Sequence, residues 1–295
     1  MSILVTGARG AVARNLAALL SARGLAHRLG SREPAGPRTV RCDLSDPGTF
    51  PEALAGARSV FLYAEASGIE AFVEEAVAAG VEHVVLLSSS AVLAPAAADN
   101  PLAAAHRTVE DALLASPLRA TLLRPGSFAT NALGWAGPLR AGTPVRLPYP
   151  GAHTDPVHEA DLAEAAYAVL TDPALAGRSY TLTGPQSLTF ADQLSILGRA
   201  LGRPVPYEEV TAEQWKAEVG AFIPGPYADA LLEYWAAGDG VPATLTDHVT
   251  RLTGRPARSF GTWAEEHVGD FSADGFRNAE DPGPLARTGA SGKGE

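Results

Sequence analysis

Cysteine is almost missing from this 295-residue chain: Cys42 is the single one, so no disulfide can form within it. A lone thiol fits a reducing compartment. Met1 is followed directly by an apolar segment with no signal peptide, so we expect a cytoplasmic protein. No apolar run approaches the roughly 20 residues that cross a membrane.

Basic residues are also in deficit, with 23 Lys and Arg against 33 Asp and Glu and a net charge of -10. This balance argues against a nucleic-acid or anionic-membrane partner. The small-molecule substrate that we expect is inferred from the aromatic residues of the second half of the chain. The seven histidines are scattered without convergent partners, so we expect no metal site. A G-x-S-x-G nucleophile elbow is absent, which argues against a serine hydrolase.

What the chain does have is a strand, a glycine turn and a helix at its start, SILVTGARGAVAR. Ile3–Val5 is predicted to be a buried strand, and a helix is predicted from Ala11 to Arg23. Gly7 permits the tight turn, and Gly10 lets the backbone approach a pyrophosphate at the helix N-terminus. The segment therefore predicts a dinucleotide site, with a glycine turn that binds no ligand as the alternative.

The end of the second expected strand indicates which dinucleotide is bound. In an NAD site an acidic residue near this point would bind the ribose 2′-hydroxyl, but the chain has Ser31 and Arg32. Arg32, with Arg9 from the glycine turn, can hold a 2′-phosphate. The acidic Glu33, which follows immediately, argues against a phosphate at this place. The alternative is that Arg32 is an ordinary solvated arginine of the loop. We predict NADP over NAD.

Strands and helices alternate up to about residue 125, which predicts an α/β fold with a doubly wound parallel sheet. After the third strand, Asp43 can bind the adenine amino group beside Leu44, or simply form a turn. After the fifth strand, Ser88–Ser90 places hydroxyls where they can meet a nicotinamide or a substrate carbonyl.

The second half of the chain has a different pattern. Residues 131–151 are rich in glycine and proline and are predicted to be irregular. Residues 203–254 are predicted to be helical and are unusually aromatic, which fits a small cap over a pocket. We predict an NADP-binding domain at 1–131 and 153–184, a substrate-binding cap at 132–152 and 185–268, and a disordered tail at 269–295.

Five segments in this order carry a family resemblance: TGARGAVA, VVLLSSS, HRTVEDALLASPLRATLLRPGSFATN, DPVHEADLAEAA and RSYTLTGPQSLTFADQL. Together they resemble the NmrA-like group of atypical short-chain dehydrogenase/reductases over about Ser2 to Val268. The group includes NADPH-dependent quinone reductases, iminium reductases of the ergot-alkaloid type, and members that bind the cofactor without catalysis.

One position departs from most short-chain dehydrogenases, which use a tyrosine and a lysine four residues apart. The matching residues here are His106 and Glu110, which share one helix face. We predict His106 as a proton donor, with Glu110 orienting it or keeping it charged. The alternative is that both are surface residues of the helix.

We therefore predict an NADPH-dependent oxidoreductase that transfers a hydride to a small conjugated acceptor (a quinone, enone or iminium ion), as a monomer or homodimer. The alternatives are an NADP-binding redox sensor without catalysis and an isomerase or cyclase on the same fold. The predicted catalytic residues are His106, Ser90 and Glu110; the predicted cofactor-binding residues are Thr6, Gly7, Arg9, Gly10, Ala11, Val12, Ser31, Arg32, Asp43, Leu44, Ser88, Ser89 and Pro125; the predicted substrate-binding residues are Phe128, Asn131, Trp135, Tyr227, Tyr234 and Trp235.

Overall fold

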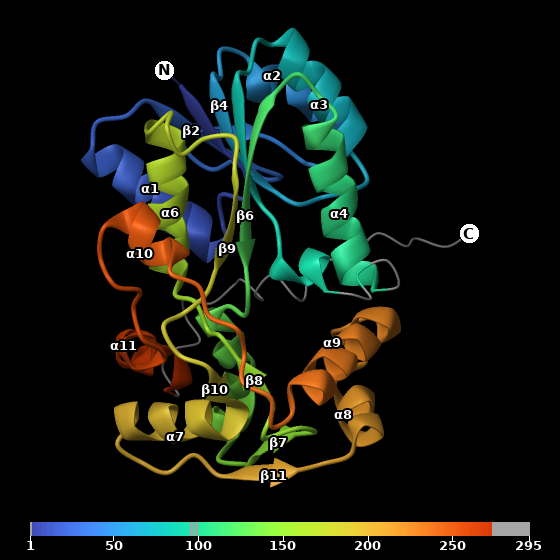
Figure 1. Cartoon of the computed structure of the whole chain (residues 1–295), viewed down its shortest axis with the longest axis vertical. Coiled ribbons are helices and arrows are strands. Elements are labelled where there is room, and N and C mark those ends of the chain that lie inside the picture. Colours follow the sequence, from blue (N-terminus) through green and yellow to red (C-terminus); the bar gives the residue numbers. More distant parts are fainter. Residues whose placement is uncertain (1, 95–96, 98–99, 273–295) are drawn as a thin grey trace. The chain divides into compact units, whose positions relative to one another are not determined.

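A computed structural model describes residues 2–94, 97 and 100–272 of the chain (Figure 1). Contacts divide the chain into two units. Unit 1 comprises Met1–Gly126, Glu159–Leu182 and Asp247–Pro256, and unit 2 comprises Ser127–His158, Thr183–Thr246 and Ala257–Glu295. Among the described residues, no helix combines the length and the apolar character needed to cross a membrane.

Unit 1 contains a seven-stranded sheet in the order β3-β2-β1-β4-β5-β6-β9, and every pairing in it is parallel. The strands are β1 (Ile3–Val5), β2 (His27–Ser31), β3 (Thr39–Arg41), β4 (Ser59–Tyr63), β5 (His83–Leu87), β6 (Arg119–Pro125) and β9 (Ser179–Leu182). The order reverses at β1, with β2 on one side and β4 on the other. This is the doubly wound sheet that the alternation of strands and helices predicts.

Helices cover both faces of this sheet (Figure 1). They are α1 (Ala11–Ala22), α2 (Phe50–Leu54), α3 (Ile69–Ala78), α4 (Pro101–Leu114), α6 (Glu159–Thr171) and α10 (His248–Thr253), with short 3-10 turns η1 (Pro47–Thr49) and η2 (Ser90–Leu93). Phe50, Phe72 and Leu113 bring α2, α3 and α4 into one apolar core with one face of the sheet. On the other face α1 packs against α6, and α6 packs against α10.

Unit 2 is mainly helical, as predicted for the smaller domain, and also contains two short pairs of strands. It contains η3 (Ala129–Trp135), α5 (Ala136–Ala141), β7 (Val145–Leu147), β8 (His153–Thr154), β10 (Leu188–Thr189), α7 (Phe190–Ala200), β11 (Tyr207–Glu209), α8 (Ala212–Val219), α9 (Gly225–Gly238), α11 (Phe260–Glu266) and η4 (Val268–Phe271). Thr189 caps α7 through a reciprocal capping box with Asp192. The fully buried Trp263 is the centre of its larger apolar core.

Three predicted segments differ from the structure. Residues 131–151 contain a helix and a strand, and residues 203–254 contain β11, because β7 and β11 pair with each other in parallel. α10 belongs to unit 1 because it packs on α6, whereas the prediction gave it to the cap. The predicted tail begins too early, since Phe271 is buried against Trp263; the rest of that tail, 273–295, lies outside the described residues.

Candidate functional site

The glycine turn after β1 lies at the carboxyl edge of the sheet, where its order reverses. Gly7 has a φ of +65°, which disfavours any side chain, and Gly10 is the N-cap of α1. No side chain caps the first turn of α1, so the first N–H groups of the helix, from Ala11 and Val12 on, remain available to an anion. The turn therefore fits a pyrophosphate.

Tyr63, at the end of β4, covers the turn and was not predicted. A Cβ added at Gly7 would lie 2.6 Å from Cδ2 of Tyr63, and one added at Gly10 would lie 2.6 Å from the Tyr63 hydroxyl. The packing of this aromatic ring therefore requires both glycines. Thr6 is fully buried and joins β1 to β4, since its Oγ1 donates to the Phe61 carbonyl at 3.1 Å and accepts from the Tyr63 N–H at 3.0 Å.

The charged residues at the end of β2 have different partners. Arg9 pairs with Glu33 at 3.2 Å, and both side chains are largely exposed. Ser31 is buried and bonds the backbone of Glu33, so its hydroxyl shapes the loop. Arg32 is exposed and forms no ion pair or hydrogen bond with any described residue. The hydrogen-bond donors of its guanidinium are therefore not used within the described residues.

Asp43 and Leu44 follow β3 at the same edge. The Asp43 carboxylate accepts from the N–H and hydroxyl of Ser45, at 3.1 and 2.7 Å, which is the turn-forming role given as the alternative. Leu44 is partly buried against the core under α2 and α3. Neither contact excludes an adenine nearby.

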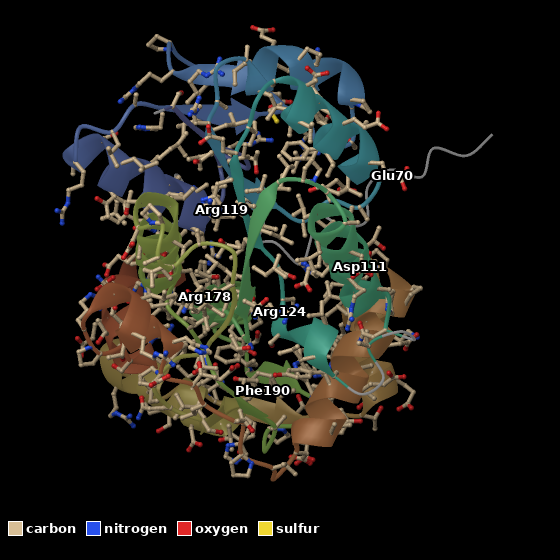
Figure 2. All side chains as sticks on the ribbon, turned by 45° about the horizontal axis from the view of Figure 1, so that its top comes forward. Glu70, Asp111, Arg119, Arg124, Arg178 and Phe190 are labelled. Carbon is tan, nitrogen blue, oxygen red and sulfur yellow. The ribbon has the colours of Figure 1, made fainter. Side chains whose placement is uncertain are left out.

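Glu110 forms the strongest polar contacts near the end of β5 and β6. Its side chain is 2% exposed and accepts two hydrogen bonds from Arg124, at 2.8 and 2.6 Å, and one from the Ser88 hydroxyl at 2.6 Å. Figure 2 labels Arg124, which extends from β6. Burial works to raise the pKa of Glu110, but the bonds from Arg124 and Ser88 outweigh it and lower the pKa. Glu110 therefore stays ionised and forms an ion pair with Arg124. The helical spacing of His106 and Glu110 did not predict this partner.

His106 lies one turn before Glu110 on α4. Its Nδ1 is buried without a hydrogen-bond partner among the described residues. Burial lowers the pKa of His106, and the charge of Glu110 only partly opposes this. A neutral imidazole is a hydrogen-bonding group rather than an acid at neutral pH, so the prediction that Glu110 keeps His106 charged is not supported by this geometry.

Three more predicted residues, Ser89, Ser90 and Pro125, lie at or after the ends of β5 and β6. Ser90 is half-buried, and its hydroxyl has no partner among the described residues. Ser89 caps η2 by accepting from the Ala91 N–H at 3.2 Å. Pro125 is buried at the end of β6. Ser90 and His106 thus both have unused hydrogen-bonding capacity in the part of the chain that the structure describes.

The predicted substrate residues all lie in unit 2. Trp135 packs edge-on against Phe190, labelled in Figure 2, at 6.1 Å, and Phe190 packs against Trp235 at 5.3 Å. Tyr227 is half-buried on α9, and Asn131 is exposed in η3. Trp135 and Trp235, two of the residues predicted to stack on the substrate, therefore pack on Phe190 instead of having free rings.

A buried carboxyl group in unit 2 was not predicted as a functional residue. Asp155 is 6% exposed, and its Oδ1 accepts from the Ser127 N–H at 2.8 Å. Burial raises its pKa to about 6, and no cation among the described residues balances the charge. Burial raises the pKa of Tyr234, the charge of Asp155 raises it further, and the Ser127 side chain opposes this only in part. Phe128 follows Ser127 and pairs with Val157.

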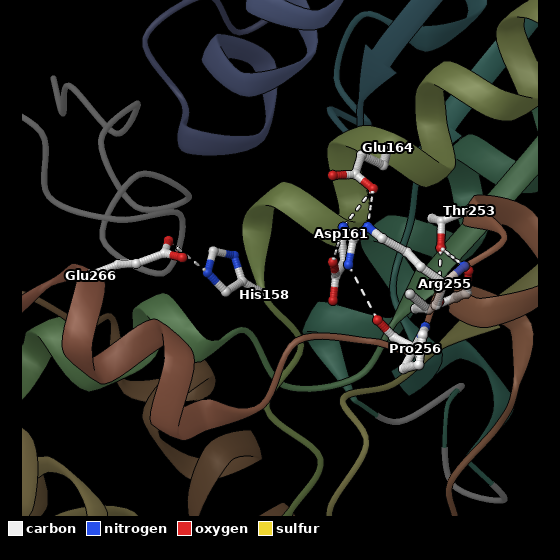
Figure 3. A network of polar contacts seen from close by, with 8 residues as sticks. His158, Asp161, Glu164, Thr253, Arg255, Pro256 and Glu266 are labelled. Atoms are coloured by element: carbon white, nitrogen blue, oxygen red, sulfur yellow. Dashed lines mark hydrogen bonds and ion pairs between the residues drawn. The ribbon is translucent and has the colours of Figure 1, made fainter.

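Two further polar networks have a structural character (Figure 3). In unit 1, Arg255 after α10 donates to Glu164 and to the fully buried Asp161, both at 2.8 Å, and so ties the α10 segment to α6. In unit 2, His158 contacts Glu266 of α11 at 3.2 Å. Within the described residues, no group of three or more His, Cys, Asp or Glu side chains is arranged to hold a metal ion.

Comparison with known proteins adds to this picture. A family model described as NAD(P)H-binding matches residues 7–173. The chain is 35% identical to (4-alkanoyl-5-oxo-2,5-dihydrofuran-3-yl)methyl phosphate reductase of Streptomyces griseus, over 92% of this chain and 100% of that protein. It is 32% identical to the NAD(P)H azoreductase of Xenophilus azovorans, over 92% and 99%.

The fold has solved counterparts as well. The NADPH-dependent quinone oxidoreductase of Escherichia coli, complexed with NADPH, has a TM-score of 0.76 at 22% identity, covering 90% of this chain and 99% of that one. The triphenylmethane reductase of Citrobacter sp., complexed with NADP(H), has a TM-score of 0.77 at 21% identity, covering 91% and 100%. At this identity the two structures bear on the fold alone.

Proposed function

The chain belongs to the NAD(P)H-binding, NmrA-like family of atypical short-chain dehydrogenase/reductases and is an NAD(P)H-dependent reductase, and we propose that it uses NADPH to reduce a small conjugated acceptor such as a quinone, enone or iminium ion. The observation that carries the choice of acceptor is the absence of a tyrosine–lysine pair at His106 and Glu110. Without it, an acceptor that delocalises negative charge is the easier one to reduce.

The names of the relatives are consistent with this acceptor class. One is named a reductase of a furanone phosphate and another an azoreductase, and both names describe reduction of an unsaturated, electron-poor group. Bound NADPH would supply the hydride. The glycine turn and the N-terminus of α1 would hold its pyrophosphate, and Arg32 its 2′-phosphate.

We propose a positioning role for His106 and Ser90. Because burial keeps His106 neutral, its ring would donate or accept a hydrogen bond rather than release a proton. The unpartnered Ser90 hydroxyl would bind a substrate oxygen or the nicotinamide amide. Glu110 and Ser88 would act indirectly, by fixing Arg124 and the end of β5. Trp135, Tyr227 and Trp235 would provide apolar surface for the acceptor.

The direct test is single-turnover oxidation of NADPH by a panel of quinones, enones, azo compounds and iminium ions. At least one class should oxidise the cofactor at a saturable rate. If none does, while NADPH binding changes the association of the chain with a partner, the redox-sensor alternative is correct. Measuring NADPH binding separately keeps a failed acceptor screen from being mistaken for a failed cofactor site.

Cofactor preference has its own test. Arg32→Ala should weaken NADPH binding about 10- to 100-fold, the equivalent of about 1.5–3 kcal/mol for a charged contact, and leave NADH binding nearly unchanged. Arg38→Ala is the matched control. Arg38 is also an exposed arginine, but it precedes β3 and so lies at the amino ends of the strands, away from the edge where Arg32 follows β2. Equal losses for the two cofactors on titration would refute the NADP assignment.

We also infer a cytoplasmic location, since the single cysteine is free and buried. Because the net charge is -10, we infer that the protein does not bind nucleic acid. We expect it to be a monomer or a homodimer. Light scattering of the purified protein distinguishes the two assemblies.

A further inference from the structure

We propose that the free edge of the Arg124 guanidinium binds the carbonyl oxygen of the acceptor and stabilises the negative charge that hydride transfer leaves on it. The acceptor is then a quinone or an enone and not an iminium ion. This inference rests on the reductase function proposed above and narrows its acceptor class. All the residues that carry it lie in unit 1.

The guanidinium of Arg124 has two edges, and only one of them is used. Nε and Nη2 donate to the two oxygens of Glu110, at 2.8 and 2.6 Å. This side-on pair leaves the donors of Nη1 and the second donor of Nη2 without a partner among the described residues. Nη1 is not one of the buried side-chain atoms that lack a partner, and 18% of the side chain is exposed. A small molecule can therefore reach the free edge, which is a fork of parallel donors suited to oxygen.

The guanidinium is held in place before any substrate arrives. Glu110 is buried, and its Oε1 also accepts from the Ser88 hydroxyl at 2.6 Å. The Ser88 N–H donates to the carbonyl of Leu123, the residue before Arg124, at 2.7 Å, and so joins the end of β5 to β6. A donor that is already fixed needs no reorganisation when charge develops on the substrate, which is the condition for strong electrostatic stabilisation.

Arg124 also lies on the part of the sheet edge where the reacting end of the cofactor is expected. Arg32 follows β2, on one side of β1, and is the residue proposed above to hold the 2′-phosphate of the adenosine half. A dinucleotide that crosses the edge at β1 extends on the other side toward β4, β5 and β6. Ser88 follows β5, and Arg124 is the last residue but one of β6. Both therefore lie at the carboxyl ends of the strands on the nicotinamide side.

The charges around the fork favour an oxygen that becomes negative. Two guanidinium groups act on the single carboxylate of Glu110, those of Arg124 and Arg107, which leaves one positive charge in excess. Arg107 is kept nearby because its Nη2 donates to the Val92 carbonyl of η2. His106 adds no charge, since burial lowers its pKa. One excess positive charge attracts an oxygen that gains one negative charge, and it repels a cationic iminium ion.

The chemical step balances for a carbonyl acceptor. A carbon of the quinone or enone accepts a hydride from bound NADPH, which is oxidised to NADP⁺, and the π electrons move to the carbonyl oxygen. The free N–H groups of Arg124 bind this oxygen as it becomes an anion. Water then supplies the one proton that completes the reduced product. An iminium ion becomes a neutral amine when it accepts the hydride, so it has no negative charge for Arg124 to stabilise.

Kinetics with two kinds of acceptor test the role of Arg124. Arg124→Lys keeps a cation beside Glu110 and removes the free fork. It should lower the single-turnover rate with a quinone or an enone by about 10²-fold, the effect of losing an oxyanion donor, and keep the NADPH affinity. The rate with an iminium ion should not fall. Arg119→Lys is the matched control, because Arg119 is an exposed arginine at the other end of β6 (Figure 2), and it should keep every rate of the wild type.

A second measurement does not depend on turnover. 4-Nitrophenol, whose absorbance reports its ionisation, serves as a stable probe of the oxyanion site in the presence of NADP⁺. The pKa of the bound phenol should be lower than in solution for the wild type and for Arg119→Lys, and most of this shift should be lost in Arg124→Lys. If Arg124→Lys does not fold, the double variant Glu110→Gln/Arg124→Met, which removes both buried charges, takes its place.

Three results would overturn the inference. They are equal rates for the wild type and Arg124→Lys with every carbonyl acceptor, a faster reduction of iminium ions than of carbonyl acceptors by the wild type, and a nitrophenol titration that the loss of Arg124 does not change. If no acceptor of any class is reduced, the proposed function fails, and the nitrophenol titration alone decides whether Arg124 binds an oxyanion.

Discussion

Glu110 in unit 1 and Asp155 in unit 2 are buried carboxyl groups whose pKa values are shifted in opposite directions. Glu110 is 1% exposed and Asp155 is 6% exposed, so both lose most of their hydration. Glu110 has the Arg124 guanidinium at 2.6 Å and a lowered pKa, whereas Asp155 accepts from the backbone N–H of Ser127 and its pKa is raised to about 6. The comparison teaches that the neighbouring cation, not the depth of burial, sets the charge state of each group.

The largest expected effect comes from removing that cation. Arg124→Met should lower the free energy of unfolding by about 3–5 kcal/mol, because it leaves the Glu110 charge buried and unpaired. It should also raise the pKa of Glu110, so that this site comes to resemble Asp155. Urea unfolding at neutral pH measures the first effect. A loss below about 1 kcal/mol would mean that solvent replaces the guanidinium and that the comparison fails.

Removing the unpaired charge should act in the other direction. The pKa of Asp155 is higher in the folded protein than its ordinary value of 3.8, so ionisation costs stability as the pH rises from there through about 6. Asp155→Asn keeps an oxygen acceptor for the Ser127 N–H and removes the cost. It should therefore raise the free energy of unfolding at neutral pH by up to about 3 kcal/mol.

The size of this effect depends on pH. Below a pH of about 3.8 Asp155 is protonated in both states, and the Asp155→Asn variant and the wild type should be equally stable. For Glu110 the order is reversed: its lowered pKa gives stability at neutral pH that is lost on acidification. Unfolding curves over a pH series separate the two. Destabilisation of Asp155→Asn at neutral pH would show that the charged carboxylate is favourable where it lies.

The smallest expected effect concerns hydroxyl donors. Ser88→Ala removes a 2.6 Å bond to Glu110 and should cost about 1.5 kcal/mol, with a rise in the pKa of Glu110. Ser127→Ala is the matched change in unit 2, where Asp155 is bound through the N–H of the backbone and keeps that bond. Carboxyl titration by nuclear magnetic resonance should therefore detect a shift for Glu110 alone. Similar shifts at both sites would contradict the assigned donors.

The sequence predicted the sheet of unit 1 well. Ile3–Val5 was predicted with the bounds that the structure has, and the alternation of strands and helices predicted the parallel sheet, since a short apolar run before turn residues is a local signal. The β7–β11 pair was missed because its strands have three residues each and lie about 60 positions apart. No local pattern tells a three-residue strand from a loop.

The candidate site also contains features that local sequence patterns reveal and contacts that they do not. The glycine turn could be found from spacing, because its residues are neighbours in the chain. The Arg124–Glu110 pair joins a strand to a helix, and Tyr63 reaches the glycine turn from another strand, so neither contact follows from helical periodicity. Asp155 entered the sequence analysis only as part of the segment DPVHEADLAEAA. Its raised pKa depends on its burial in the folded chain, which a sequence does not show.

The order in which unit 1 is assembled has a consequence for synthesis on the ribosome. Its first 126 residues contain six of the seven strands, but β9 and α6 come from residues 159–182, and α10, tied to α6 by Arg255, comes from residues 247–256. A nascent chain that has just completed β6 therefore exposes an unpaired sheet edge and the apolar face of α1. Since a chain grows at about 5–20 residues per second, this edge stays open for several seconds at least and is the surface that a chaperone would meet first.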